Sequence, residues 1–171
     1  MDWIYDSSED NRYRFVLGTA GDNPLICVGV NPSTAEPDHL DKTLESVNRM
    51  ALSNGFDSWI MINLYPQRAT EPNDMDRECN VEQANNNFEK IKELLSQYQK
   101  ITIWAAWGTL IEKRPYLKNQ LKRLIQIGDD LHCEWITFGK RTIKGHPHHP
   151  LYLSHDSNKQ NLEIDDYYSN L

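Results

Sequence analysis

Four short apolar runs recur along the chain, and each is followed by polar or glycine-containing sequence. They are residues 25–30 (LICVGV), 58–63 (SWIMIN), 101–107 (ITIWAAW) and 132–139 (HCEWITFG). Near-continuous apolar runs of this length are typical of strands buried on both faces, as in parallel sheets. Parallel strands need long crossover connections, so the segments between these runs are expected to hold helices.

The segments between the runs carry the periodicity of amphipathic helices. The sequence predicts helices over residues 41–54, 81–97 and 109–127. Pro115 lies inside the third and predicts a break or a second helix start there. A further strand is expected over residues 12–18, and the polar, acidic tail after Ser154 has room for a short helix near its end.

This order of elements predicts an α/β domain: a three-layer sandwich with a short, mostly parallel central sheet flanked by helices. At 171 residues the chain suits one domain, with a core over about 12–153 and a tail over 154–171. In open α/β sheets the binding crevice lies outside the carboxyl ends of the strands. The polar segments after the four runs are therefore expected to converge on one pocket.

The net charge of −7 argues against a general nucleic-acid binder, but the charge is unevenly distributed. Residues 100–149 contain nine Lys or Arg and four Asp or Glu, a local charge of +5 that leaves −12 for the rest. This stretch could give a local basic face for phosphates. The alternative is a solvated helix surface, which we favour for Lys118, Lys122 and Arg123.

No apolar run is long enough to cross a bilayer, and the acidic N-terminus lacks the features of a signal peptide. A cytoplasmic location and no membrane partner are therefore expected. Cys27, Cys79 and Cys133 form no CxxC pair, which predicts neither a disulfide framework nor a structural zinc site.

The first polar segment begins with Asn31-Pro32, and a residue before proline is pushed out of the helical region. Held in this way, the Asn31 amide could orient a water or read a polar ligand. Ser33 and Thr34 add hydroxyls at a bend that can present backbone N–H groups to an anion. The alternative is a turn in which the asparagine satisfies its own backbone. Asp41 is a natural N-cap of the next helix, with a pocket-facing carboxylate as the alternative.

Candidate binding residues follow the other runs. Asn63 offers the paired C=O and NH₂ groups that suit a nucleobase edge, or is a core amide bonded to the neighbouring strand. Arg68 is a candidate clamp for phosphate or carboxylate. Aromatic residues near strand ends could stack on a planar ligand, although such residues also serve as core or rim. These candidates are Tyr65, Trp107 with the adjacent Gly108, and Tyr152.

The loop GHPHHPLY contains His146, His148 and His149. Histidine can donate a hydrogen bond to a developing anion or move a proton near neutral pH. Without a carboxylate or cysteine at known spacing, the three imidazoles do not predict a metal site. We expect no metal and no cofactor, and at least one of the three histidines to lie on plain surface.

Long motifs in this order resemble the DUF1643 family of uncharacterised bacterial and phage proteins, over roughly residues 12–153. They are NPSTAEPDHLDKT, NLYPQRATEP, WAAWG and GHPHHPLYL. More distantly, GVNPS, IWAAWG and HPHHPL are similar to motifs of the uracil-DNA glycosylase superfamily. That resemblance implies a short parallel sheet flanked by helices.

The glycosylase resemblance also implies roles for individual residues. Asn31 would orient the attacking water, Asn63 would read the base edge, and a loop histidine would stabilise charge on the departing base. The histidine motif has an extra residue, so either His146 or His149 could be the counterpart. His149, followed directly by Pro150, is favoured.

These observations predict a protein that recognises a nucleobase or nucleotide. One candidate activity is hydrolysis of an N-glycosidic bond in DNA or in a modified nucleotide, and a base in a duplex would have to be flipped out to react. The other candidate is a non-catalytic nucleotide- or nucleobase-binding module that acts through a protein partner.

Overall fold

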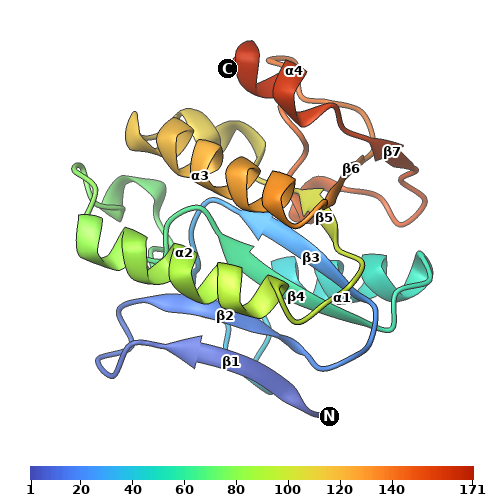
Figure 1. Cartoon of the computed structure of the whole chain (residues 1–171), viewed down its shortest axis with the longest axis horizontal. Coiled ribbons are helices and arrows are strands. Elements are labelled where there is room, and N and C mark those ends of the chain that lie inside the picture. The colour runs from blue at the N-terminus through green and yellow to red at the C-terminus, as the bar shows by residue number, and fades with distance from the viewer.

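The computed structural model describes residues 1–171 and contains one seven-stranded sheet (Figure 1). The strands are Trp3–Ser7 (β1), Arg14–Thr19 (β2), Pro24–Gly29 (β3), Ser58–Asn63 (β4), Thr102–Ala105 (β5), Glu134–Phe138 (β6) and Lys159–Asn161 (β7). Their order in the sheet is β1-β2-β4-β3-β5-β6-β7. The chain is therefore an α/β protein, as the sequence predicted.

The expectation of a mostly parallel sheet is wrong, because the sheet is mixed. The pairs β4–β3, β3–β5 and β5–β6 are parallel, whereas β1–β2, β2–β4 and β6–β7 are antiparallel. Sequence reasoning missed β1 and β7, because neither is an apolar run: β1 is only partly buried and β7 is exposed. Apolar runs identify the central parallel strands and overlook the polar edge strands.

Four helices accompany the sheet. They are Lys42–Ser53 (α1), Val81–Leu95 (α2), Tyr116–Asp130 (α3) and Ile164–Ser169 (α4). The first three confirm the predicted helices to within a few residues. Pro115 precedes α3 and separates it from a short 3₁₀ helix at Gly108–Glu112, so the predicted break at this proline is also confirmed.

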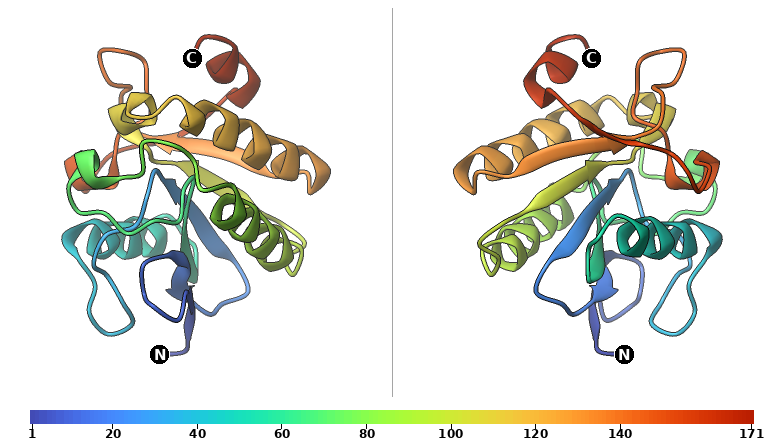
Figure 2. Two further views of the ribbon diagram at one scale, coloured as in Figure 1. Left: turned by 90° about the vertical axis from the view of Figure 1, so that its left-hand side faces the viewer. Right: turned by 90° about the vertical axis from the view of Figure 1, so that its right-hand side faces the viewer.

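The helices cover both faces of the sheet, with α1 on one face and α2 and α3 on the other (Figure 2). Along β4, Ile60 and Ile62 pack in the core on the α2–α3 side, and Trp59 and Met61 pack in the core on the α1 side. Alternate residues of one strand thus supply two separate cores, which explains why the central strands are apolar throughout.

The loops after the parallel strands meet at one edge of the sheet. Gly29 and Asn63 end β3 and β4 and are register partners. Beyond them, the backbone N–H of Leu64 donates to the carbonyl of Gly29, and Gly108 N–H donates to Pro147 O across the loops after β5 and β6. The polar segments of the sequence are therefore held together by backbone hydrogen bonds.

The C-terminal segment is anchored to the histidine-containing loop through Tyr167 of α4. The indole N–H of Trp107 donates to the Tyr167 hydroxyl at 2.9 Å, and that hydroxyl lies 2.8 Å from His146 Nδ1. The other ring nitrogen of His146, Nε2, lies 3.1 Å from Glu112 Oε1, so both nitrogens of this buried ring have a hydrogen-bond partner. Burial raises the pKa of Tyr167 to about 12, so the hydroxyl keeps its proton at neutral pH.

Replacing Tyr167 by Phe is expected to lower the free energy of unfolding by about 1–3 kcal/mol, because the Trp107 N–H and His146 Nδ1 both lose their partner. Urea-induced unfolding measures the loss. Tyr168→Phe is the matched control, because the Tyr168 hydroxyl makes no hydrogen bond. The one polar contact of Tyr168 is between its ring and the Lys118 ammonium, and phenylalanine keeps that ring. Equal losses in the two variants would contradict an anchoring role for the Tyr167 hydroxyl.

Candidate functional site

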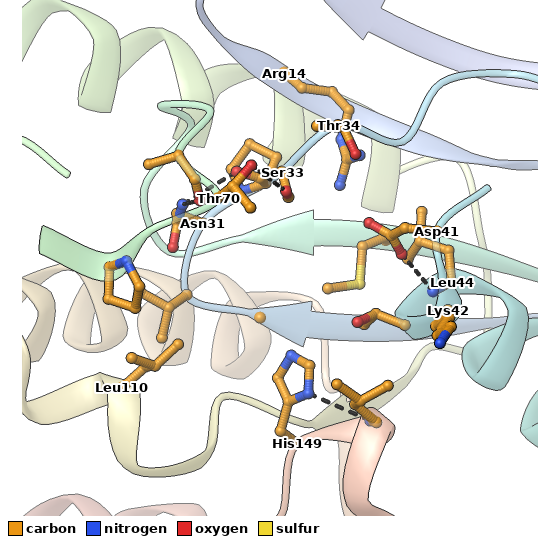
Figure 3. A pocket seen from close by; sticks show the side chains of 18 residues that line it. Arg14, Asn31, Ser33, Thr34, Asp41, Lys42, Leu44, Thr70, Leu110 and His149 are labelled. Atoms are coloured by element: carbon orange, nitrogen blue, oxygen red, sulfur yellow. Dashed lines mark hydrogen bonds between the residues drawn. The ribbon is translucent and has the colours of Figure 1, made fainter. Parts of the chain in front are cut away.

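A cavity of about 440 Å³ opens at the carboxyl ends of β3 and β4 (Figure 3). Its walls come from the loop after β3, the start of α1, the loop after β4 and the histidine-containing loop. This volume lies within the range of small-molecule sites. Of the residues predicted from sequence, six line it: Asn31, Pro32, Ser33, Thr34, Asp41 and His149.

Asn31 is fixed by its own amide nitrogen. Nδ2 donates to the carbonyl oxygens of Ala69 at 2.9 Å, Pro32 at 3.1 Å and Gln67 at 3.3 Å. Both N–H groups are therefore used by the loops, and Oδ1 is the polar atom that Asn31 can offer to the cavity. The two sequence interpretations are thus compatible, since the nitrogen satisfies the backbone and leaves a fixed acceptor.

His149 precedes the 3₁₀ helix Pro150–Tyr152, and its Nδ1 accepts a hydrogen bond from the Leu151 N–H at 3.3 Å. An accepting Nδ1 places the proton of the neutral ring on Nε2, which is directed into the cavity (Figure 3). Burial lowers the pKa of His149, although the nearby Asp41 carboxylate acts in the opposite direction. The cavity therefore receives a hydrogen-bond donor from an uncharged imidazole.

Arg14 on β2 also lines the cavity, and sequence reasoning missed it. The residue is only 2% exposed, and its guanidinium lies beside Thr34, on the side toward Asp41 (Figure 3). Nη1 donates to Ala35 O at 3.0 Å, Nε has no partner, and no carboxylate lies within ion-pair distance. The pKa of Arg14 is lowered to about 10, first by burial and then by the positive charge of Arg68. The one available signal was a charged residue at the start of the apolar stretch RFVLG.

Asp41 both caps α1 and lines the cavity, so the two interpretations of this residue are compatible. Its Oδ1 accepts from the Leu44 N–H at 3.0 Å and so caps α1, and the same carboxylate lines the cavity. On the opposite wall, the hydroxyls of Ser33 and Thr70 are hydrogen-bonded at 3.0 Å. One carboxylate, one buried guanidinium and several hydroxyls therefore share the cavity.

Asn63, Tyr65 and Arg68 do not line this cavity. Asn63 is buried beside its register partner Gly29, and neither polar atom of its amide has a hydrogen-bond partner. The Tyr65 hydroxyl is fully committed, because it donates to Asp76 and accepts from the Asn80 N–H. Arg68 donates to Ser33 O at 2.6 Å and braces the loop after β3 from outside, beside a separate shallow groove.

A second cavity, of about 400 Å³, adjoins the first and shares His149, Pro72 and Leu110 with it. Trp107, Gly108 and Tyr152 line this second cavity. Gly108 has φ +58°, which favours glycine, and the exposed Tyr152 ring has its centroid 5.9 Å from that of His149. His146 lines neither cavity, and both its ring nitrogens are occupied by Tyr167 and Glu112.

No group of three or more His, Cys, Asp or Glu side chains is arranged to hold a metal ion. None of the helices combines the length and apolar character that crossing a membrane requires.

Fold and site together define an α/β protein with a polar cavity at the carboxyl edge of its parallel strands. The chain belongs to the DUF1643 family, described as "Protein of unknown function", whose model matches residues 12–151. This range includes every residue that lines the first cavity and all but Tyr152 of those that line the second. A search of curated proteins found no match.

The replacement Asn31→Asp is expected to lower the free energy of unfolding by about 2–4 kcal/mol, because a carboxylate would face three carbonyl oxygens that now accept hydrogen bonds. Thermal and urea unfolding measure the effect. Asn85→Asp introduces the same change at an exposed site on α2 and should stay within about 0.5 kcal/mol of the parent. If Asn31→Asp proves equally mild, Asn31 does not tie the two loops together.

Proposed function

We propose that the chain recognises a nucleotide and hydrolyses its N-glycosidic bond, using the cavity between β3, α1 and the histidine-containing loop. One observation carries this proposal. A fixed acceptor, Asn31 Oδ1, and a fixed uncharged donor, His149 Nε2–H, line the same cavity, and backbone hydrogen bonds set the orientation of each. The sequence resemblance of GVNPS and HPHHPL to glycosylase motifs concerns these same two residues.

In the proposed reaction, the bond between C1′ of the sugar and the base nitrogen breaks, and its electron pair leaves with the base. Asn31 Oδ1 accepts a hydrogen bond from a water, which directs a lone pair of that water toward C1′. A new C1′–O bond forms, and the Asp41 carboxylate receives the proton that the water loses. His149 Nε2–H donates to the base atom on which negative charge develops.

The fold is consistent with this reaction. The parallel core β4-β3-β5-β6 has helices on both faces, and we infer that it is the three-layer, uracil-DNA glycosylase-like arrangement. The base would occupy the second cavity, where the exposed Tyr152 ring provides aromatic surface beside His149. Asn63 is buried and lines neither cavity, so it takes no part in base reading in this arrangement.

The alternative is a nucleotide-binding module without catalysis, which acts through a protein partner. Both N–H groups of the Asn31 amide donate to backbone carbonyls. This bonding favours the alternative, because holding the loops together would by itself account for an asparagine at this position. The two functions differ in whether base is released.

The deciding experiment is a base-release assay on free nucleotides and on single- and double-stranded DNA containing uracil and other altered bases. His149→Ala and Asn31→Ala should each lower the rate by about 10²–10³-fold, through loss of the donor and of the water-orienting acceptor. His155→Ala, at an exposed histidine outside both cavities, should leave the rate unchanged. Binding of nucleotides without release from any substrate would favour the module.

The acid side of the pH profile tests the role assigned to His149. Because burial lowers the pKa of His149, the neutral donor should persist below the ordinary value of about 6.5. The rate is therefore expected to stay level as the pH falls through 6.5 and to decline only at lower pH, when the ring is protonated. A rate that rises toward acid in the parent but not in His149→Gln would instead make His149 a proton donor.

A further inference from the structure

We propose that the first cavity contains a phosphate subsite centred on Arg14, and that the substrate is a free nucleoside monophosphate rather than a base within a DNA duplex. This inference rests on the function proposed above and specifies its substrate.

The first observation is the buried, uncompensated charge of Arg14. Of its five N–H donors, one meets the Ala35 carbonyl, and the residue is 2% exposed. Burying a guanidinium without an acid partner is costly, and a native fold seldom keeps such a group without a role. Arg14 lines the cavity and its guanidinium lies beside Thr34 (Figure 3), so an anionic ligand in the cavity could reach it.

The second observation is the positive character of the surroundings. The N-terminus of α1 begins at the cavity wall with Lys42, and unpaired helical N–H groups carry a partial positive charge there. Arg68 lies close enough to depress the pKa of Arg14 further. Asp41 is the one acidic residue among those that line the cavity, and its Oδ1 already accepts from the backbone.

The hydroxyl of Thr34 beside the guanidinium adds a neutral donor (Figure 3), and Thr70 adds another hydroxyl elsewhere on the cavity wall. A phosphate monoester has three terminal oxygens and can use a guanidinium, helix N–H groups and hydroxyls together. A carboxylate has only two oxygens and would leave part of this donor set unused.

The burial of Arg14 favours a small ligand over a DNA duplex as the occupant of the cavity. Phosphates of double-stranded DNA are gripped by exposed basic side chains, whereas Arg14 is buried and the chain carries a net charge of −7. A free nucleotide could enter instead. Its phosphate would lie at Arg14 and its base in the second cavity, with the glycosidic bond near the shared residue His149.

Isothermal titration calorimetry with inorganic phosphate, deoxyuridine monophosphate and deoxyuridine tests the subsite without requiring turnover. The parent is expected to bind the monophosphate at least about tenfold more tightly than the nucleoside, with inorganic phosphate competing. Arg14→Gln should weaken phosphate binding by about 10–100-fold. Arg12→Gln removes the same charge from an exposed site nearby and should leave binding unchanged.

Arg14→Gln alters a buried position, so its fold is checked by circular dichroism. If it does not fold, Lys42→Gln at the exposed start of α1 takes its place, with a smaller expected weakening of about two- to fivefold. The subsite is overturned if the parent binds monophosphate and nucleoside equally, or if Arg14→Gln folds and binds phosphate as the parent does.

The base-release assay separates the two proposals. Phosphate-dependent binding without release of any base would keep the subsite and reject the hydrolase. Release at equal rates from nucleoside and monophosphate, without phosphate binding, would keep the hydrolase and reject the subsite. Release from duplex DNA in preference to the free monophosphate would also overturn the inference.

Discussion

The site depends on the tie between the loops that follow two neighbouring parallel strands. Asn31 Nδ2 donates to the carbonyl oxygens of Ala69 and Gln67 in the loop after β4, and the Ala69 N–H donates to Pro32 O in return. Arg68 adds a bond to the Ser33 carbonyl from outside. Since Gly29 of β3 lies opposite Asn63 of β4, the two loops start side by side. These hydrogen bonds then fix the position of one loop relative to the other. One side-chain amide thereby shapes the cavity and leaves its oxygen free.

The other half of the site is held by a separate set of contacts. His149 lies on the loop after β6, which Gly108 N–H holds through the Pro147 carbonyl and which Tyr167 holds through His146. The two halves are thus fixed largely by different elements and face each other across the cavities, with one direct link in which the Ser46 hydroxyl of α1 donates to Pro150 O at 3.0 Å. A ligand that touches both Asn31 and His149 would join them, since loops carried on a rigid scaffold can close on what they bind.

The sequence was informative where one local pattern determines the structure. Apolar runs identify the central strands, helical spacing identifies α1 to α3, and Asn31-Pro32 and His149-Pro150 mark bends at strand ends. Asn63 shows the limit of such reasoning. It ends a buried strand as expected, but whether its amide reaches the cavity depends on the neighbouring strand: Gly29, its register partner, lines the cavity and Asn63 does not. Arg14 was missed because only the packed loops decide that a charged residue on β2 is enclosed rather than exposed.

Two polar side chains violate the usual rules of burial close to the floor of the first cavity. The Asn63 amide has no hydrogen-bond partner, and the Arg14 guanidinium has no counter-ion. Gly29 lines the cavity beside Asn63, and a Cβ there would lie 2.7 Å from Met61 Cε and 3.0 Å from Asn63 Oδ1. Unsatisfied buried groups cost stability, and natural proteins retain such violations mainly at functional sites. Buried groups without a partner also occur elsewhere in the core, as at Trp104 Nε1 and Thr137 Oγ1, but those residues do not line the cavity. Arg14 does line it, and this is the physical reason to place a ligand there.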